Sequence, residues 1–499
     1  MKIETIVLIT YIISLSILFF FGSHGFSMIY YYFKTFKKRK EDLSSEDMIL
    51  KEFPMVTIQL PLYNERYVIN RLIDAVIRIE YPKDKIEFQI LDDSTDDSTE
   101  IINEHIKKYI EQGYDIKLIH RTNRKGYKAG ALKEGLEIAK GEFVAIFDAD
   151  FIPRQKFLMR TLPYFYTNPK IGLVQTRWEH LNHDYSLMTK TEALALDGHF
   201  VIEQAVRNRA GFFINFNGTG GIWRKSCIFD AGNWEADTLT EDLDLSYRAQ
   251  MKGWKFKYLI NFTSPAELPA EINSLKSQQF RWTKGAIETA KKIYPKVLRS
   301  DMSFKMKFQS FIHLCSNMAY PFILLAALLN LPILLIKETG EYDPVFKFMS
   351  VFIFAFISSF LFYLYSQKDV YPDWQKRIMY FPVFMAGSMG FSVNNTKAVF
   401  EGLINKKSEF VRTPKFKIMH NRDSWHDKKY LLTKRIKITT YIEAVLALYC
   451  FTGVIMSIVY VQIAALPFQL MFASGFGMIS YLSIRQVILY NRAIKKAAK

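Results

Sequence analysis

The chain has 499 residues, of which 49% are hydrophobic, 15% aromatic and 23% charged, and its formal net charge is +17. More apolar than a soluble protein usually is, yet still rich in charge, it is predicted to join a soluble domain to membrane segments. Lys and Arg gather beside the apolar runs, at 34–40 and 406–417, as the positive-inside rule predicts for cytoplasmic loops, so no nucleic-acid partner is expected. Three widely spaced cysteines offer neither a disulfide framework nor a zinc site.

The first apolar segment, residues 5–33, contains no charged side chain when His24 is neutral. At about 1.5 Å per residue it is long enough to cross a bilayer. A signal peptide is the alternative, but the basic residues follow the apolar run and no small-x-small cleavage site is evident. We therefore predict a membrane span with its N-terminus outside.

Four further spans are predicted, at about 316–336, 345–366, 440–461 and 466–489. Segment 376–400 is ambiguous because its apolar part is short and contains a proline and two glycines. If it crossed the membrane, the basic loop 401–437 would lie outside, against the positive-inside rule. We therefore expect an interfacial or re-entrant helix there, five spans in total, and a multi-pass protein whose segment 35–303 is cytosolic.

Between residues 55 and 260, short β-rich runs alternate with helical patterns. The predicted strands are 55–62, 86–91, 116–119 and 143–148, and the predicted helices are 65–80, 97–112 and 127–140. This alternation predicts a largely parallel sheet with helices on both faces. Ligands bind such sheets beyond the carboxyl ends of the strands.

Acidic residues follow two of these strands. IEFQILDDSTDD places Asp92 and Asp93 at the end of one, and FVAIFDADF places Asp148 and Asp150 at the end of another. In an extended segment Asp-x-Asp points both carboxylates to one side, which suits Mg²⁺ or Mn²⁺ and, through the metal, a diphosphate. The alternative is that these aspartates cap helices or close turns. The sequence contains no Walker-type phosphate loop, which argues against an ATP-driven motor or transporter.

Two further motifs precede predicted helices. In NRKGYKAGALKEGL, Arg124, Lys125 and Lys128 stand where cations and amide groups can meet an anion; a solvated basic turn is the alternative. In DTLTEDLDLSYRAQMKGW, Thr240 is a plausible N-cap with acidic residues in the first turn. Capping and the helix dipole explain that acidity without any catalysis, so both readings stay open.

The stretch LKSQQFRWTKGA places Gln278, Arg281 and Trp282 at i, i+3 and i+4. On a helix, that spacing gathers an amide, a planar guanidinium and an indole ring on one face. About twenty residues later the chain becomes strongly apolar, so this face is expected close to the membrane.

Taken together, the motifs DDS (92–94), DAD (148–150), TED (240–242) and QQFRW (278–282), followed by membrane spans, resemble glycosyltransferase family 2 in its membrane-embedded, processive branch. That branch includes cellulose, hyaluronan and chitin synthases. Longer stretches are similar to the cellulose-synthase-like A group of plant β-mannan and glucomannan synthases: LDDSTDDST, NRKGYKAGALKEGL, VQTRWEHLN, FNGTGGIWRK, TEDLDLSYRAQMKGWKF and QQFRW.

The resemblance covers about residues 50–430 and implies an α/β GT-A (Rossmann-like) cytosolic glycosyltransferase domain joined to an α-helical transmembrane bundle. The expected organisation is an N-terminal transmembrane helix (1–35), the cytosolic GT-A domain (36–300), and a C-terminal part with interfacial helices, transmembrane helices and a cytosolic gating-like loop (301–499, loop 401–437). We expect neither a cyclic-dinucleotide sensor domain nor a zinc module.

The resemblance also implies roles for single residues. Asp242 is the expected general base, and Asp148 and Asp150 are the expected ligands of Mg²⁺ or Mn²⁺. The implied nucleotide-sugar-binding residues are Asp93, Lys128, Asp148, Gln278, Arg281, Thr413 and Lys415. The implied acceptor-binding residues are Trp282, Asn217, Gly218, Thr219 and Glu241. A plain turn is the alternative reading of FNGTGG, which contains three of them.

EFVRTPKF (409–416) resembles the family's mobile gating loop, written F-x-V-T-x-K. Phe410, Thr413 and Lys415 fit that pattern, but Arg412 stands where the family has valine, so its contacts with the substrate are left open. Closure of this loop over the diphosphate would exclude water.

The expected activity is that of an inverting, processive membrane hexosyltransferase. It would polymerise a β-linked hexose polysaccharide (β-1,4-mannan, glucomannan or β-glucan) and translocate it, using GDP-mannose, GDP-glucose or a UDP-sugar. The expected partners are this donor, the growing polysaccharide and membrane lipid. A single-addition enzyme with a lipid acceptor, such as a ceramide glucosyltransferase, is the alternative. A non-catalytic sugar- or nucleotide-sensing protein is disfavoured, because a binding module needs no general base.

Overall fold

A seven-stranded mixed sheet lies at the centre of the chain between residues 52 and 300. The computed structural model describes residues 2–38, 48, 50, 52–408, 411–419, 422–423, 425, 428 and 435–497. The strands are β1 (Val56–Leu62), β2 (Ile86–Asp92), β3 (Asp115–His120), β4 (Phe143–Ile146), β5 (Ile171–His180), β6 (Gly221–Arg224) and β7 (Lys255–Ala266). Their order is β3-β2-β1-β4-β6-β5-β7.

Strands β1 to β4 form a parallel half-sheet, as the sequence predicts. Helices α4 (Ile69–Ile77) and α5 (Ser98–Glu111) cover one face, and α6 (Tyr127–Glu137) covers the other. In β4, Phe143 and Ala145 pack in the first core while Val144 and Ile146 pack in the second. This alternation is the period of two that directs side chains to opposite faces of a strand.

The carboxyl ends of β1, β2 and β4 meet at one edge of the sheet. The register pairs Leu62 with Asp92 and Gln59 with Ile146, so the residues that follow β2 and β4 lie on either side of the end of β1. The chain winds from β1 to β2 on one side and reaches β4 on the other. This is a topological switch point, where α/β sheets bind their ligands.

The second half of the sheet was not predicted from the sequence. Strand β6 runs antiparallel to both β4 and β5, and β7 runs parallel to β5. Short elements complete this half: η2 (Lys83–Lys85), α7 (Phe157–Thr161), α8 (Pro163–Thr167) and α11 (Lys225–Asp230).

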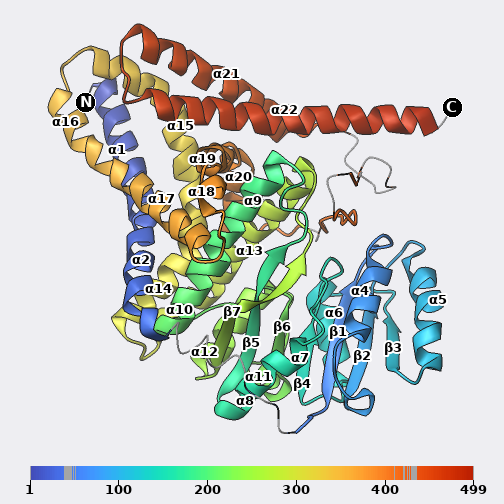
Figure 1. The fold of residues 1–499 in the computed structure, drawn as a ribbon. Coiled ribbons are helices and arrows are strands. Elements are labelled where there is room, and N and C mark those ends of the chain that lie inside the picture. The colour runs from blue at the N-terminus through green and yellow to red at the C-terminus, as the bar shows by residue number, and fades with distance from the viewer. Residues whose placement is uncertain are drawn as a thin grey trace.

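A layer of helices joins the sheet to the apolar part of the molecule (Figure 1). It contains α9 (Leu187–Asp197), a π-helical segment η3 (Gly198–Gln204), α10 (Ala205–Ala210), α12 (Glu241–Met251) and α13 (Ile272–Arg299). Segment η3 and α10 pack against α17 and α2 of the apolar bundle, and α13 packs against α14, α20 and α22. The helices that connect to the sheet are thus in direct contact with the apolar helices.

In the described part of the chain, five helical stretches are long and apolar enough to cross a membrane: Ile3–Lys34, Phe304–Glu338, Asp343–Lys368, Ile438–Val459 and Leu466–Arg492. Their elements are α1 (Ile3–Gly22), α2 (His24–Lys34), α14 (Phe304–Cys315), η4 (Ser316–Met318), α15 (Ala319–Glu338), α16 (Asp343–Met349), η5 (Ser350–Phe352), α17 (Ile353–Lys368), α21 (Ile438–Val459) and α22 (Leu466–Ala497). Large side chains such as Val445 and Leu448 are 65% and 70% exposed, which suits lipid as the surrounding solvent. The five predicted spans are confirmed as candidates.

The ambiguous segment 376–400 is divided into short helices, α18 (Trp374–Ile378), α19 (Phe381–Gly390) and α20 (Ser392–Leu403). None of them is among the candidate spans of the described chain, in agreement with the predicted interfacial or re-entrant segment. Helix α19 packs against α22 so closely that a Cβ atom at Gly475 would overlap the carbonyl oxygen of Ala386.

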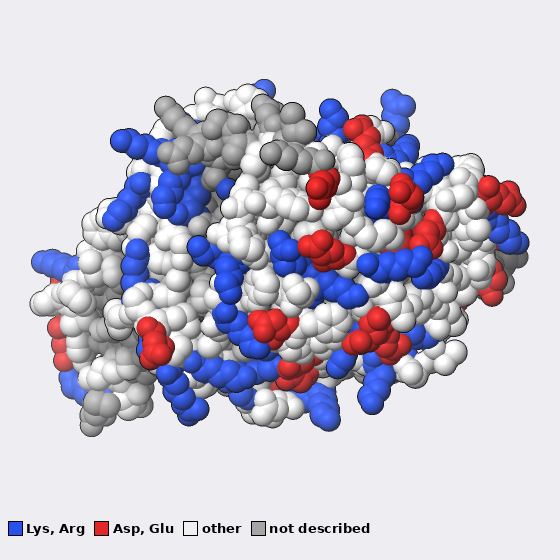
Figure 2. Space-filling view, turned by 90° about the horizontal axis from the view of Figure 1, so that it is seen from below, with Lys and Arg blue, Asp and Glu red and all other residues white. Residues whose placement is uncertain are grey.

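The face of the molecule opposite to α21 and α22 carries charged side chains of both signs, with Lys and Arg the more abundant (Figure 2). This face belongs to the sheet domain. A surface of this kind faces water, in contrast to the exposed apolar side chains of α21.

We predict that Gly475→Ala lowers the thermal unfolding midpoint of the detergent-solubilised protein by several degrees, because the added methyl group forces α19 and α22 apart. Gly477→Ala is the matched control: its Cβ would have only Ala447 nearby, at 3.8 Å, and alanine is the better helix former. Equal midpoints for the two variants would contradict the close approach of these helices.

Candidate active site

A cavity of about 200 Å³ lies beyond the carboxyl ends of β1, β2 and β4. Its walls gather residues from loops after three strands, from the first turn of α12, from α13 and from segment 411–419. Of the predicted site residues, the walls include Asp93, Lys128, Asp148, Asp150, Asn217, Gly218, Glu241, Asp242, Gln278, Arg281, Trp282, Thr413 and Lys415. Motifs spread over more than 300 positions therefore meet in one place. Thr219, one of the residues implied to bind the acceptor, lies outside the described walls.

The two aspartates after β2 have different roles. Asp92 closes a turn: it accepts hydrogen bonds from the Ser94 amide (3.0 Å) and the Thr99 hydroxyl (2.6 Å). Asp93 lines the cavity, and the Arg121 guanidinium binds both of its carboxylate oxygens, at 2.7 and 2.6 Å. Each of these two side chains is 5% exposed. The turn-closing alternative thus applies to Asp92, while Arg121 is a site residue that the sequence did not reveal.

The Asp-x-Asp segment is not extended, which corrects the geometry assumed from the sequence. Strand β4 ends at Ile146, and the Phe151 amide donates to the Asp148 carbonyl (3.0 Å), which closes a turn. Both carboxylates nevertheless face the cavity. A turn of this kind brings them together as effectively as a strand does.

Each of these carboxylates is paired with a lysine. Lys128 Nζ lies 2.5 Å from Asp148 Oδ1 and donates to the Gly218 carbonyl at 2.9 Å. Lys415 Nζ lies 2.8 Å from Asp150 Oδ2. Burial raises the pKa of Asp148, and the Lys128 ammonium counteracts only part of that rise. These lysines balance buried negative charge that would otherwise be costly.

Asp242 lies in the first turn of α12, beside Glu241. Burial raises the pKa of Asp242 to about 7, and the neighbouring Glu241 carboxylate adds to the rise. The Thr240 hydroxyl pairs with Thr289 Oγ1 (3.0 Å) and does not cap the helix. Asp242 Oδ1 instead accepts a hydrogen bond from the Leu243 amide (2.8 Å), so stabilisation of the helix N-terminus stays open beside a catalytic role. A carboxyl group that titrates near neutral pH is suited to general-base catalysis.

The FNGTGG turn brings backbone close to Asp242. Gly218 has φ = 79°, and a Cβ atom there would lie 3.2 Å from Asp242 Oδ2 and 3.4 Å from Lys128 Nζ. Both the positive φ and this approach favour glycine. Thr219 lies fully buried beneath the turn, where its hydroxyl accepts the Asp148 amide hydrogen bond (2.9 Å). Thr219 therefore supports Asp148 from below.

Several buried polar atoms of the cavity wall have no hydrogen-bond partner among the described residues: Asn217 Nδ2, Gln278 Oε1 and Thr413 Oγ1. Buried polar groups in folded proteins are nearly always paired. One amide donor, one amide acceptor and one hydroxyl, all left unpaired at the same cavity, are the pattern expected of a site that binds a polar ligand.

Segment 411–419 contributes Arg412, Thr413 and Lys415 to the wall of the cavity. Arg281 Nη1 donates to the Val411 carbonyl (2.9 Å), and Arg412 Nη1 lies 3.0 Å from Glu65 Oε2. Burial raises the pKa of Glu65 to about 8, against the opposing charge of Arg412. Arg412 thus pairs with Glu65, which the sequence did not single out. The predicted loop residue Phe410 lies outside the described residues.

Helix α13 holds the start of this segment as well as a wall of the cavity. Lys284, two residues after Trp282 and fully buried, donates to the Lys406 carbonyl (2.5 Å) and to Ser408 Oγ (2.7 Å). Lys291, two turns further on, donates to the Leu403 carbonyl (2.5 Å). The helix that carries Gln278, Arg281 and Trp282 is therefore tied to the chain that leads into segment 411–419.

A second acidic cluster lies outside the cavity walls. Carboxylate oxygens of Glu235, Asp237 and Asp244 lie within 4.8 Å of one another. Lys292 Nζ sits among them, at 2.5, 2.8 and 3.0 Å from the three groups. An ammonium ion already satisfies this cluster, so it has no need of a metal ion.

The arrangement of the sheet and its cavity is that of a GT-A glycosyltransferase domain. The structure of the mannosyltransferase PcManGT from Pyrobaculum calidifontis, in complex with GDP-Man and Mn²⁺, superposes with a TM-score of 0.53 at 17% identity. The match covers 79% of this chain and all of that one. This likeness establishes the fold.

Residues 54–285 match the family model described as Glycosyltransferase like family 2. The probable glucomannan 4-beta-mannosyltransferase 4 of Oryza sativa subsp. japonica is 44% identical over 252 residues, 50% of this chain and 46% of that protein. The probable glucomannan 4-beta-mannosyltransferase 3 of the same plant is 36% identical over 362 residues, 70% of this chain and 63% of that protein. The chain spans about half the length of the first curated relatives it matches.

We predict that Lys284→Met loosens residues 403–408, the chain that leads into segment 411–419. Two hydrogen bonds from a buried ammonium are lost, so amide hydrogen exchange over residues 403–408 should become about tenfold faster or more. Lys296→Met, at an exposed position of the same helix, is the control and should leave exchange there unchanged. Equal exchange in both variants would mean that Lys284 does not hold the segment.

Proposed function

We propose that this protein is an inverting membrane hexosyltransferase that extends a β-linked mannan or glucomannan from a nucleotide sugar. The observation that carries the proposal is the convergence of Asp242, the Asp148–Asp150 pair and Trp282 on one cavity. The names of the plant relatives, which are glucomannan 4-beta-mannosyltransferases, support the polymer and the linkage.

In the proposed reaction Asp242 takes the proton from an acceptor hydroxyl as that oxygen attacks the anomeric carbon of the donor sugar. The bond between this carbon and the diphosphate oxygen breaks in the same displacement. One displacement inverts the configuration, so an α-linked nucleotide sugar yields a β-glycosidic bond. Lys128 and Arg281 stabilise the charge that develops on the leaving diphosphate, which is usually the largest catalytic contribution.

The donor in this proposal is GDP-mannose, with GDP-glucose as the second sugar of a glucomannan. GDP-Man is the ligand in the PcManGT structure, which supports a guanine nucleotide. UDP-sugars are the alternative donors. Asp93, held by Arg121 at the β2 end of the cavity, lies where the nucleoside part of the donor would be bound.

Asp148 and Asp150 fit a divalent cation, because their carboxylates are hard oxygen donors at one cavity. When bound there, Mg²⁺ or Mn²⁺ supplies positive charge to the diphosphate. Lys128 and Lys415, which pair with these carboxylates, then become available to phosphate oxygens. The Mn²⁺ of PcManGT supports this assignment.

Trp282 is proposed to stack against the terminal sugar of the acceptor, because a sugar's C–H face lies well against an indole ring. Asn217, Gly218 and Glu241 complete the acceptor side of the cavity. Thr219 acts indirectly, through its hydrogen bond to the Asp148 amide.

Segment 411–419 is proposed to act as the gate of the site. The cavity of about 200 Å³ is smaller than the roughly 300–1,000 Å³ of ordinary ligand pockets, so the donor enters only when this segment moves away. Once the donor is bound, Thr413 and Lys415 close over the diphosphate and exclude water.

The proposed orientation places residues 36–300 and loop 401–437 in the cytosol, after an N-terminal span within residues 1–35. The charged face of the sheet domain in Figure 2 supports a position in water. Residues 301–499 contribute the other spans, and translocation of the growing polymer between them belongs to the proposal.

A single-addition reaction on a lipid acceptor is the second candidate, because one observation favours it. A largely apolar cavity of about 670 Å³ lies between α9, α13, α19 and α22. It includes Leu275 and Gln279 of α13, next to Gln278 of the active-site wall. An apolar cavity beside α13, the helix that carries Trp282, suits a lipid chain.

We predict that the solubilised protein, incubated with Mg²⁺ or Mn²⁺ and each nucleotide sugar in turn, gives a ladder of products from GDP-mannose. Product size on polyacrylamide, before and after digestion with a β-mannanase, checks both length and linkage. A single glycolipid product would select the second candidate. Absence of sugar transfer from every donor would reject both.

We predict that Asp242→Asn lowers the transfer rate at least about a hundredfold, because the amide cannot accept the acceptor proton. Nucleotide affinity, measured by calorimetry, should change little, since Asp242 contacts the acceptor side. Asp230→Asn, a change of a surface carboxylate that is 49% exposed, should have wild-type activity. Normal polymer yield from Asp242→Asn would refute the general-base assignment.

A further inference from the structure

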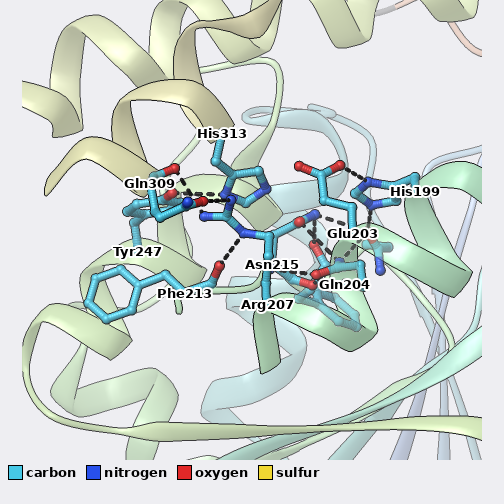
Figure 3. A network of polar contacts seen from close by, with 11 residues as sticks. His199, Glu203, Gln204, Arg207, Phe213, Asn215, Tyr247, Gln309 and His313 are labelled. Atoms are coloured by element: carbon cyan, nitrogen blue, oxygen red, sulfur yellow. Dashed lines mark hydrogen bonds and ion pairs between the residues drawn. The ribbon is translucent and has the colours of Figure 1, made fainter. Parts of the chain in front are cut away.

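The π-helical segment η3 carries a histidine and a glutamate that point toward each other (Figure 3). The histidine also contacts Asn217 of the FNGTGG turn (residues 216–221). His199 Nδ1 lies 2.9 Å from Glu203 Oε2, one turn further along, and His199 Nε2 lies 3.1 Å from Asn217 Oδ1. Single π-helical turns often occur at functional sites. The proposed reaction assigns no role to these contacts.

The orientation of the Asn217 amide follows from the groups around it. Its Oδ1 atom faces Gln204 Nε2 (3.0 Å) and Asn215 Nδ2 (2.9 Å) in addition to His199. Gln204 Nε2 also donates to the Asn215 carbonyl (2.8 Å), and Asn215 Nδ2 to the Phe216 carbonyl (3.2 Å), so both are nitrogens. A reversed Asn217 amide would place NH₂ against two NH₂ groups. Its Nδ2 atom is therefore the one with no partner among the described residues.

The protonation state of His199 follows in the same way. Both of its ring nitrogens face atoms that only accept hydrogen bonds: a carboxylate oxygen and an amide oxygen. A neutral imidazole has a single N–H, so only the imidazolium satisfies both contacts. Burial lowers the pKa of His199, but its hydrogen bond to Glu203 and the charge of Glu203 raise the pKa more, and the net pKa lies above the usual value.

Titratable and charged groups from several neighbouring elements surround the His199–Glu203 pair. Burial raises the pKa of Glu203, yet the hydrogen bond from His199 lowers it well below the usual range, so Glu203 stays ionised at neutral pH. The other groups that act on the pair are Arg207 of α10, His313 of α14, His24 of α2 and Tyr363 of α17. Arg207 is held by the Phe213 and Gln309 carbonyls, and the Tyr247 hydroxyl pairs with His313 Nδ1 (2.8 Å).

We propose that the His199–Glu203 ion pair is a positioning group that turns the free amide N–H of Asn217 toward an oxygen of the acceptor sugar. This inference rests on the proposed function, because it assigns the sugar to the acceptor side of the same cavity. Asn217 touches the substrate, whereas His199 and Glu203 act through it. The geometry that carries the proposal is the set of donors around Asn217 Oδ1.

Loss of the His199 proton has a defined consequence. Neutral His199 keeps its proton on Nδ1, next to the Glu203 carboxylate, and Nε2 then presents a lone pair to Asn217 Oδ1. Two acceptors in contact repel each other, so one of the three contacts that position Asn217 Oδ1 becomes repulsive and the amide is displaced, although Gln204 and Asn215 still donate to it. Because the pKa of His199 is raised, the imidazolium is present at neutral pH and is lost as pH rises through that pKa. Sugar transfer should therefore fall on the alkaline side.

The test uses the full-length protein in detergent, with GDP-mannose and a short β-linked manno-oligosaccharide acceptor. The rate and the KM of each substrate are measured between about pH 6 and pH 9.5. Glu203→Gln should move the alkaline fall to lower pH by about one unit or more, because the counter-charge is lost. His199→Gln keeps an amide donor but cannot titrate, so the fall should disappear. The KM of the acceptor should rise in both variants, and that of the donor should not.

The control is His105→Gln. His105 lies on α5 and pairs with Asp74 of α4 (2.6 Å), so this variant should preserve the wild-type pH profile. Asp242 must be ionised to accept the acceptor proton, and its pKa is raised to about 7, so transfer should also fall on the acidic side, and this acidic limb should persist in every variant. An alkaline limb that stays in place in Glu203→Gln, or a change in donor KM alone, would overturn the proposal.

A second measurement does not depend on activity. In ¹⁵N-histidine NMR spectra, the signal that disappears in His199→Gln should have both ring nitrogens protonated at about pH 7.5. A neutral ring there would overturn the inference even if transfer is observed. An imidazolium at His199 in a protein that transfers no sugar would instead reject the proposed function.

Discussion

Neutralisation of buried negative charge is the constraint on which the rest of this site depends. Asp93 and Asp150 are buried, the Asp148 side chain is 33% exposed, and burial raises the pKa of Glu65 to about 8. Each of these four acidic groups has a cation within 3.0 Å. Two of these cations come from the sheet domain and two from segment 411–419. A carboxylate removed from water without such a partner would lose its charge or destabilise the fold. Arg412 and Lys415 of segment 411–419 are thus attracted to Glu65 and Asp150, two acidic groups of the cavity wall.

The sequence was most informative where a local pattern is enough. Strands such as β1 (VTIQLPL) and β2 (IEFQILD) are buried runs in which apolar residues outnumber polar ones, and the helices between them follow the 3.6-residue period. Strand β5 was missed because polar residues sit in its buried part. Gln175 donates to the carbonyls of Thr219 and Gly220, and Arg177 donates to that of Ile260. Such a strand appears polar until its distant partners are known.

The same distinction explains the site. Asp242, Trp282 and the Asp-x-Asp pair stand in ordered motifs, so resemblance identified them, even though the last lies in a turn and not in a strand. Arg121, Lys284 and His199 stand in no recognised pattern. Their importance depends on partners that are 28, 122 and 18 positions away. Only the folded structure brings these side chains to the atoms they bind.

Helix α13 has a consequence for how the protein moves. Trp282 lines the cavity, and Lys284, two residues further along, donates hydrogen bonds to the chain that leads into segment 411–419. A helix of this length transmits a small shift as a rigid rod. Helix α13 therefore connects the cavity wall to the contacts that Lys284 makes with Lys406 and Ser408. In the proposed reaction, a sugar that displaces the indole would also shift the chain that leads into segment 411–419.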